Sequence, residues 1–336
     1  HGGGWPAVLY TIRTARATGG IRRMWHALRS RNACKTCALG MGGQLGGMVN
    51  EQGRFPEFCK KSVQAMGADL QSPISSEMIS NLTFERLQRM ESRDLERLGR
   101  LSCPMMAGPL DLAYRPISWA EAMDRITAGM KKASPDRSFF YLSGRSSNEA
   151  SFLLQIFARL WGTNNVNNCS YYCHQASGVG LASVTGSGTA TVDVEDLDHC
   201  DLVFLIGANP SSNHPRLMRA LMDLKRRGGK VIVINPLHEV GLQRFKIPSD
   251  VRSMLRASRI SDLYVQPHAG GDPMLLTGIT KAIIERGAVD ETFVCDHAQG
   301  WDELVDVISS ISWDEITVGS GVSREIIDQI ADVPAR

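Results

Sequence analysis

The sequence has no excess of charge of either sign and no long hydrophobic run. Its 37 lysines and arginines stand against 35 aspartates and glutamates. This balance gives no overall electrostatic reason to expect a nucleic acid or a membrane surface as partner. No apolar stretch approaches the ~20 residues that a membrane-spanning helix needs. We therefore expect a soluble globular chain with no direct membrane span and no nucleic-acid partner.

The cysteines do not form the pattern of a disulfide framework. Eight of them are unevenly spaced in 336 residues, and a chain of this size does not need disulfides to build a core. Metal binding or catalysis in a reducing compartment is the more natural use of these thiols. No signal-peptide pattern follows His1. The expected location is the cytoplasm.

Acidic residues are missing from residues 1–50. The same stretch carries seven spread cations: Arg13, Arg16, Arg22, Arg23, Arg29, Arg31 and Lys35. Such a run is most often a solvated face. It also suits a docking surface for an acidic electron-transfer partner, or a positive environment for a negatively charged cluster. Nucleic acid is disfavoured because no recognition motif accompanies the charge.

A second close cysteine pair, which a zinc ribbon would need, is also missing. Cys34 and Cys37 are separated by two residues in a glycine-rich stretch, and Cys59 follows at a distance. A redox dithiol is expected between a strand and a helix rather than in such a loop. An iron-sulfur cluster with Cys34, Cys37 and Cys59 as ligands fits better. The fourth ligand is not evident, and Cys103 is a minor candidate.

The segment around Cys173 and His174 carries the other candidate chemistry. A thiol beside an imidazole, at the start of a Gly/Ser-rich run that reaches Gly188, suits metal ligation or proton transfer. The alternative is a buried structural cysteine and a loop histidine with ordinary hydrogen bonds. The residues alone leave both interpretations open.

An alternation of strands and helices is expected after residue 108. A capping box from Ser118 to Glu121 predicts a helix to about Lys132, and Pro215 suits the first position of a later helix. An earlier helix is predicted over residues 84–98. Apolar strands, each ending in a Gly, Ser, Asn or Asp turn, are expected at 138–142, 201–206, 230–234 and 262–266.

The carboxyl ends of parallel strands form one edge of a sheet, where doubly wound folds bind nucleotide-like ligands. The turn after the first strand includes Gly144 and Asn148, and a plain turn explains it equally well. No GxGxxG occurs at any of these turns. A dinucleotide of the NAD type is therefore disfavoured, and a different phosphate-bearing ligand is expected.

Together these residues resemble the N-terminal half of a formate-dehydrogenase-like molybdopterin oxidoreductase alpha subunit. The resemblance covers roughly residues 20–336. It rests on Asn32 to Gly43, Cys59-Lys60-Lys61, Cys173-His174 and Gly207 to Pro215. The implied fold is α/β, with an iron-sulfur domain followed by doubly wound, Rossmann-like pterin-binding domains. The implied divisions are an iron-sulfur domain at 1–107, the first part of a split α/β domain at 108–168 and a dinucleotide-binding domain at 169–336. The resemblance also implies that the barrel-like C-terminal domain of the family is not covered by these residues.

The resemblance also implies cofactors and residue roles. Cys34, Cys37 and Cys59 look like ligands of a [4Fe-4S] cluster, with Lys61 between cluster and pterin. Cys173 looks like the ligand of molybdenum or tungsten, and His174 like the residue that handles a proton. The residues that match stretches holding a bis-molybdopterin guanine dinucleotide (bis-MGD) are Gly207, Asn209, Asn213, His214, Asn235, Gly271 and Asp272.

Some positions depart from that pattern. Met41 stands where formate dehydrogenases carry a further cluster cysteine, and Asn235 and Leu237 stand where they carry Asp and Arg. The implied activity is a two-electron oxidation of a small, formate-like substrate, with electrons passing through pterin to the cluster and on to an acceptor protein or subunit. A non-catalytic iron-sulfur electron-transfer or assembly module is the alternative. A zinc-binding structural protein is the weakest reading.

Overall fold

The computed structural model describes residues 2–31, 47–49, 53, 55, 59–144 and 146–333. These form two compact units, each built from more than one segment. The first unit combines His1–Arg13, Met48–Lys61 and Asp193–Arg336, and the second combines Thr14–Gly47 and Ser62–Val192. Helices α1 (Trp5–Ala17) and α3 (Lys60–Asp69) each contribute residues to both units.

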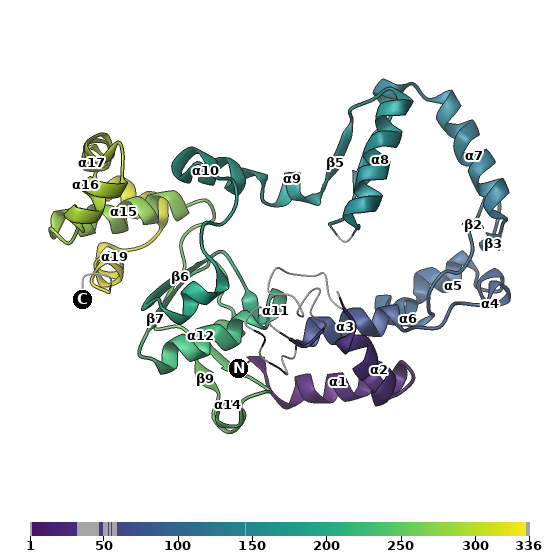
Figure 1. The fold of residues 1–336 in the computed structure, drawn as a ribbon, viewed down its shortest axis with the longest axis horizontal. Coiled ribbons are helices and arrows are strands. Elements are labelled where there is room, and N and C mark those ends of the chain that lie inside the picture. Colours follow the sequence, from purple (N-terminus) through teal and green to yellow (C-terminus); the bar gives the residue numbers. More distant parts are fainter. Residues whose placement is uncertain are drawn as a thin grey trace. The chain divides into compact units, whose positions relative to one another are not determined.

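A parallel sheet forms the centre of the first unit (Figure 1). Its strands are β6 (Leu202–Ile206), β7 (Lys230–Ile234) and β10 (Leu263–Val265), in the order β10-β7-β6. The pairing is in regular register, with Leu202 opposite Lys230 and Leu263 opposite Ile232. The strands predicted at 201–206, 230–234 and 262–266 are therefore confirmed, and their carboxyl ends lie at one edge.

Helices cover both faces of this sheet. Successive side chains of β7 point to opposite faces, so both faces are apolar and each packs against helices. Val231 and Val233 pack in one cluster with Met218 and Leu221 of α12 (Leu217–Arg226). Ile232 and Ile234 pack in the other with α15 (Asp272–Glu285), α18 (Trp313–Ser320) and α19 (Arg324–Ala331). A doubly wound α/β layer is thus present in this unit.

Shorter elements complete the first unit. A small sheet pairs β8 (Arg244–Lys246) with β1 (Gly2–Gly3) in parallel and with β9 (Ser258–Arg259) in antiparallel. The remaining helices are α11 (Pro210–Asn213), α13 (Val240–Gln243), α14 (Val251–Leu255), α16 (Glu291–His297), α17 (Trp301–Ser310) and a 3-10 turn at Val194–Asp198.

The second unit contains more helix than strand. Its paired strands are β4 (Phe140–Leu142) with β5 (Val166–Asn168), in parallel, and β2 (Met105–Met106) with β3 (Arg115–Pro116), in antiparallel. Its helices include α2 (Ile21–Arg29), α4 (Ser76–Ser80), α5 (Phe84–Arg89), α6 (Ser92–Arg97), α7 (Trp119–Lys132), α8 (Asn148–Trp161), α9 (Cys169–Cys173), α10 (Gln175–Thr185) and a 3-10 turn at Pro135–Arg137.

The single helix predicted over residues 84–98 is wrong. The structure has α5 and α6 instead, separated by Met90 and Glu91 in extended conformation. Neither helix buries a residue. Because helices this short depend on a packed apolar face, nothing holds the two together as one.

The position expected for Pro215 is also wrong. Pro210 occupies the first turn of α11, and α12 begins only at Leu217. His214 has φ −133° and ψ 61°, which agrees with the steric bias of a residue before proline against helical geometry. Pro215 therefore lies in the turn between the two helices.

The predicted capping box is only half formed. Ser118 caps α7, its hydroxyl accepting a hydrogen bond from the Glu121 amide at 3.0 Å. The Glu121 carboxylate turns instead to Arg115 and Arg125.

Within the part of the chain that the structure describes, no helix is long and apolar enough to cross a membrane.

An ion pair ties α12 to α14 and makes the first unit sensitive to acid. Asp250 accepts hydrogen bonds from Nη1 and Nη2 of Arg226 at 2.9 and 2.7 Å, and also from the Ser253 amide at 2.7 Å. The Arg226 hydrogen bonds lower the pKa of Asp250 from 3.8 to about 2. This stabilisation is present above pH 4 and is lost as the pH falls towards 2.

We expect the Asp250→Asn variant to lose about 1 kcal/mol of unfolding free energy at pH 6, a value reduced for solvent screening. The difference from the wild type should shrink at pH 3, because the Asp250 carboxyl of the unfolded chain, with a pKa near 3.8, is already largely protonated there. Urea unfolding at both pH values measures it. An equal difference at pH 6 and pH 3 would contradict the role of this pair.

Candidate functional site

Cys173 and His174 lie at the carboxyl edge of the β4–β5 pair in the second unit. The two strands are parallel, with Leu142 opposite Asn168, so the turn after β4 and the start of α9 share one edge. Asn168 caps α9, its Oδ1 accepting from the Ser170 amide at 2.9 Å. Strand β5, which the sequence did not predict, therefore fixes the start of α9, the helix that ends at Cys173.

The thiol and the imidazole are both exposed, at the junction of two helices. The His174 amide donates to the Ser170 carbonyl at 3.0 Å, and the His174 carbonyl accepts from the Gly178 amide at 3.0 Å. The backbone at His174 thus ends α9 and begins α10. Exposure of Cys173 disagrees with the alternative of a buried structural cysteine.

Gly144 and Cys169 pack closely at the base of this segment. A Cβ at position 144 would lie 2.8 Å from Sγ of Cys169, so a larger residue there would force the Cys169 thiol to move. Cys169 is half-buried, and it begins the helix that ends in Cys173. Asn148, the first residue of α8, is exposed beyond the Ser147 cap. Of the residues predicted in this turn, Gly144 is therefore the one that contacts α9.

Three tyrosine rings cluster at α9: two belong to the helix and one to β4. The sequence analysis did not single them out. The rings of Tyr141 and Tyr172 have centroids 6.3 Å apart, and those of Tyr171 and Tyr172 lie 5.2 Å apart at 81°. All three rings are exposed. The doublet before Cys173 was visible in the sequence, but Tyr141 joins it only through the pairing of β4 with β5.

The turns after β6, β7 and β10 form the predicted edge in the first unit. The Gly207 amide donates to the Ile234 carbonyl at 2.9 Å, and the Asn235 amide donates to Val265 at 2.9 Å. Gly207 has a φ of +62° and open space around its Cβ position. The edge is therefore ordered by sheet-like hydrogen bonds, and it leaves open space beside Gly207.

Side chains on this edge are partly engaged in shaping their own loops. Oδ1 of Asn209 accepts from the Ser211 hydroxyl at 2.5 Å, and Oδ1 of the buried Asn235 accepts from the Leu237 amide at 2.8 Å. Asn213 and His214 are exposed. The side chains at this edge that are accessible to a ligand are thus those of Asn213, at the end of α11, and His214, directly after it.

Gly271 and Asp272 begin α15 at the same edge. Gly271 is buried, and a Cβ there would lie 2.9 and 3.0 Å from the carbonyl oxygens of Gly319 and Ser320. Asp272 is half-buried in the first turn, where a carboxylate is favoured by the helix dipole. The predicted residues of all three turns therefore share one sheet edge.

Tyr264 also shapes this edge and was missed from the sequence. Its hydroxyl donates to the Leu237 carbonyl at 2.6 Å and accepts from the Glu239 amide at 2.9 Å. Burial raises the pKa of this phenol. The ring of His238 lies 4.9 Å from that of Tyr264. No local pattern marks this tyrosine, because its partners are about 25 residues away in the chain.

The structure describes only some of the residues predicted to hold the cluster. Cys34 and Cys37 lie outside the described residues. Cys59 is buried immediately before α3, and Lys61 is half-buried in its first turn. Among the described residues, no three His, Cys, Asp or Glu side chains converge as a metal site.

Comparison with known proteins identifies the class of this fold and site. The family model for molybdopterin oxidoreductases matches residues 100–325. The chain belongs to the molybdopterin oxidoreductase family. It is 37% identical over 293 residues to Protein YdeP of Escherichia coli, a match that covers 83% of this chain and 39% of that protein.

Two further proteins are similar to parts of this chain. The chain is 33% identical over 215 residues to the F420-dependent formate dehydrogenase 2 subunit alpha of Methanococcus maripaludis, covering 64% of this chain and 29% of that subunit. Acetylene hydratase from Pelobacter acetylenicus aligns over 65% of this chain and 28% of its own, with a TM-score of 0.48 and 21% identity. The chain thus spans about two fifths or less of the length of these proteins.

Membership of this family implies a molybdopterin cofactor carrying molybdenum or tungsten. The groups present fit such a cofactor. An exposed thiol beside an imidazole suits a soft metal, and the edge around Gly207 offers open space and exposed polar side chains to a polar dinucleotide.

Proposed function

We propose that this chain supplies the metal-ligating cysteine and part of the pterin site of a formate-dehydrogenase-like oxidoreductase. The observation that carries this proposal is the exposed Cys173-His174 pair at the end of a parallel strand pair, in a chain of the molybdopterin oxidoreductase family. The 33% identity to a formate dehydrogenase alpha subunit supports a formate-like substrate.

The edge of the β10-β7-β6 sheet holds the guanine dinucleotide of a bis-MGD cofactor in this proposal. Gly207 and the residues of α11 line one side, and Asn235 and Asp272 follow on the neighbouring strands. Gly144 and Asn148 serve the turn of the second unit. What supports these assignments is the shared strand edge, with open backbone at Gly207.

An iron-sulfur cluster completes the redox chain. Cys34, Cys37 and Cys59 are its proposed ligands, and Lys61 lies between cluster and pterin as an electron relay. The burial of Cys59, two positions before the half-buried Lys61, supports this assignment. In this proposal the protein operates in the reducing environment of the cytoplasm and passes electrons to an acceptor protein or subunit.

The mechanism follows from the positions of the chain's own groups. The pterin cofactor, when bound, would supply a metal able to take up the two electrons of the substrate. Cys173 would hold that metal through Sγ. A ring nitrogen of His174 accepts the proton that the substrate releases. Gly144 allows the close packing that holds Cys169, and with it the helix that carries both groups.

Metal analysis of anaerobically purified protein tests this proposal. We expect about four irons per chain, as in one [4Fe-4S] cluster, together with molybdenum or tungsten and pterin. Cys34→Ser should lose the iron, because a thiolate ligand is removed. Cys173→Ser should keep the iron and lose the bond to molybdenum or tungsten.

The other outcomes are equally decisive. Zinc without iron or pterin would overturn the oxidoreductase assignment. Iron without molybdenum or tungsten would favour a non-catalytic electron-transfer or assembly module. Cys295→Ser is the matched control, since Cys295 is exposed in α16 and its loss should leave both metals in place.

A further inference from the structure

The loop after β7 carries a carboxylate that the fold does not use. Glu239 is half-buried and stands at the N-cap position of α13, with φ −81° and ψ 117°, but its side chain makes no cap hydrogen bond. Among the residues that the structure describes, none donates a hydrogen bond to this carboxylate or pairs with it as a cation. Withdrawing a carboxylate from water without giving it a donor costs free energy. A donor from a bound ligand would therefore stabilise this group.

The polar side chains that flank Glu239 in this loop are already engaged within the chain. Asn235 is buried, and its Oδ1 accepts a hydrogen bond from the Leu237 amide at 2.8 Å. The side-chain amide of Gln243 contacts the imidazole of His238. Glu239 is therefore the residue of this loop whose charged group remains available to a ligand.

Hydrogen bonds from the end of β10 hold this loop in one conformation. The Tyr264 hydroxyl donates to the Leu237 carbonyl at 2.6 Å and accepts from the Glu239 amide at 2.9 Å. Nε2 of Gln266, the residue directly after β10, donates to the Pro236 carbonyl at 2.9 Å. The backbone that carries Glu239 is thus fixed before any ligand arrives, so little conformational entropy is lost there on binding.

The loop also packs directly against the neighbouring loop after β6. Gly241 of α13 is buried, and a Cβ at this position would overlap the side chain of Ser211 in α11. The loop after β6 begins at Gly207, which has open space around its Cβ position. The first two loops of this sheet edge are therefore in contact, one with open space at Gly207 and the other with the carboxylate of Glu239.

This order of groups is the one in which doubly wound folds bind a nucleotide. The turn after the first strand receives the phosphates, and an acidic side chain after the next strand accepts a hydrogen bond from a ribose hydroxyl. In this chain the residue directly after β7 is Asn235, which is neutral. We propose that Glu239 takes the acidic role instead and accepts hydrogen bonds from the ribose hydroxyls of the guanosine. This inference rests on the proposed function, because the guanine dinucleotide at this edge is part of that proposal.

Binding of GDP and 2′-deoxy-GDP to the 336-residue chain tests the role of Glu239. The protein is produced in a host that makes no molybdopterin, and each nucleotide is titrated by calorimetry at pH 7. The wild type should bind GDP about tenfold more tightly than 2′-deoxy-GDP, because the deoxy compound lacks a hydroxyl that donates to the carboxylate. Glu239→Gln should bind GDP about tenfold more weakly than the wild type and should discriminate less than about twofold between the two nucleotides.

The sign of the change separates this role from simple electrostatics. A carboxylate that makes no contact with the ribose repels the diphosphate, so its removal would leave GDP binding unchanged or tighten it. Either of those results would overturn the proposal. Glu239→Gln should keep the wild-type melting temperature, because the carboxylate has no hydrogen-bond or ion-pair partner among the described residues. Wild-type discrimination against IDP, which lacks the guanine amino group, in place of 2′-deoxy-GDP would assign the carboxylate to the base and would also overturn the proposal.

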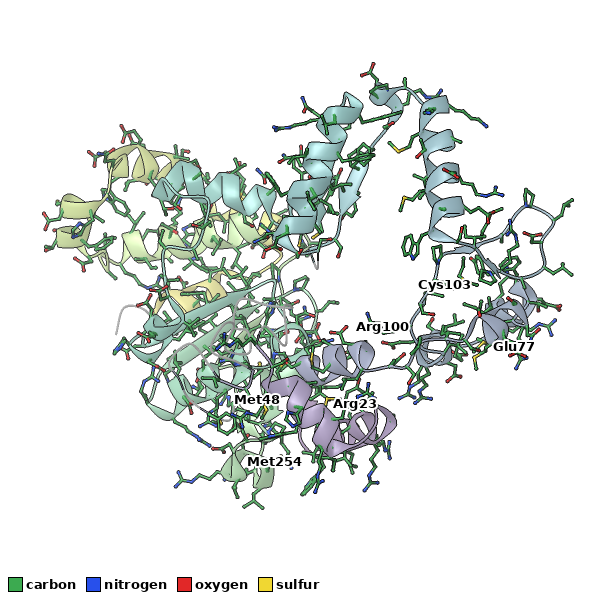
Figure 2. The ribbon with its side chains drawn as sticks, turned by 45° about the vertical axis from the view of Figure 1, so that its right-hand side comes forward. Arg23, Met48, Glu77, Arg100, Cys103 and Met254 are labelled. Atoms are coloured by element: carbon green, nitrogen blue, oxygen red, sulfur yellow. The ribbon has the colours of Figure 1, made fainter. Side chains whose placement is uncertain are left out.

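Glu77→Gln is the matched control, since Glu77 is exposed on α4 in the second unit (Figure 2). It should change the affinity for GDP less than about twofold. Protein from a host that makes the cofactor reports separately on the proposed function, through the GMP and pterin that acid releases from it. Release of both, with no GDP binding by the wild type, would overturn the role of Glu239 alone. Pterin without GMP would overturn the proposed dinucleotide, and the role of Glu239 with it.

Discussion

Replacing His174 by alanine should lower the turnover of the metal-loaded enzyme by about 10²- to 10⁴-fold, the usual contribution of a general base. The ring is exposed, and the hydrogen bonds of His174 to Ser170 and Gly178 are made by its backbone. The fold and the metal content should therefore be unchanged. Rates with formate and a redox dye, normalised to molybdenum or tungsten content, measure the effect.

His199→Ala is the control for this experiment, since His199 is exposed and no role is assigned to it. It should retain the wild-type rate. A His174→Ala enzyme that keeps its full rate would remove His174 from the mechanism. Loss of the metal in the same variant would instead assign the imidazole to metal binding or to the conformation of Cys173.

Replacing Gly271 by alanine should destabilise the first unit by about 2 to 3 kcal/mol, at the upper end of overpacking costs. The added Cβ would approach three backbone carbonyl oxygens, of Gly319, Ser320 and His268, at 2.9 to 3.1 Å. Backbone cannot rotate away as a side chain can. The last turn of α18 must shift, and the edge that begins at Gly271 should bind pterin less well.

Urea unfolding and pterin content of the purified variant measure these two effects. Gly180→Ala is the control, because Gly180 lies inside α10 with open space around its Cβ position. Alanine there should stabilise the helix by about 0.5 to 1 kcal/mol. Wild-type stability and pterin content in Gly271→Ala would show that the surrounding backbone shifts to fit the methyl group at no cost to folding or pterin binding.

Much of the sheet could be predicted because its strands are continuous apolar runs bounded by turn residues. The runs that became β6 and β7 are five residues each and almost wholly hydrophobic. Parallel strands buried on both faces are expected to have this character. The edge that joins their carboxyl ends followed from the same pattern.

Other elements could not be predicted because their stability comes from distant partners. β5 has only three residues, Val166–Asn168, and two of them are asparagine. It becomes a strand by pairing with β4 about 26 positions earlier. The break between α5 and α6 depends on the absence of a buried face, which no propensity reports.

Short spacings were sufficient to predict the cap at Ser118 and the strand-turn-helix alternation, and adjacent residues were sufficient to single out Cys173-His174 as the candidate site. Local sterics and periodic burial determine such features, so they are written in a short window of sequence. The packing of Gly144 against Cys169 and the hydrogen bonds of Tyr264 to the loop after β7 depend on the tertiary structure. Lys225 and Asp262 are 37 positions apart and bond at 2.6 Å. Such contacts exist only once burial of distant apolar surface has offset the entropy of bringing the segments together.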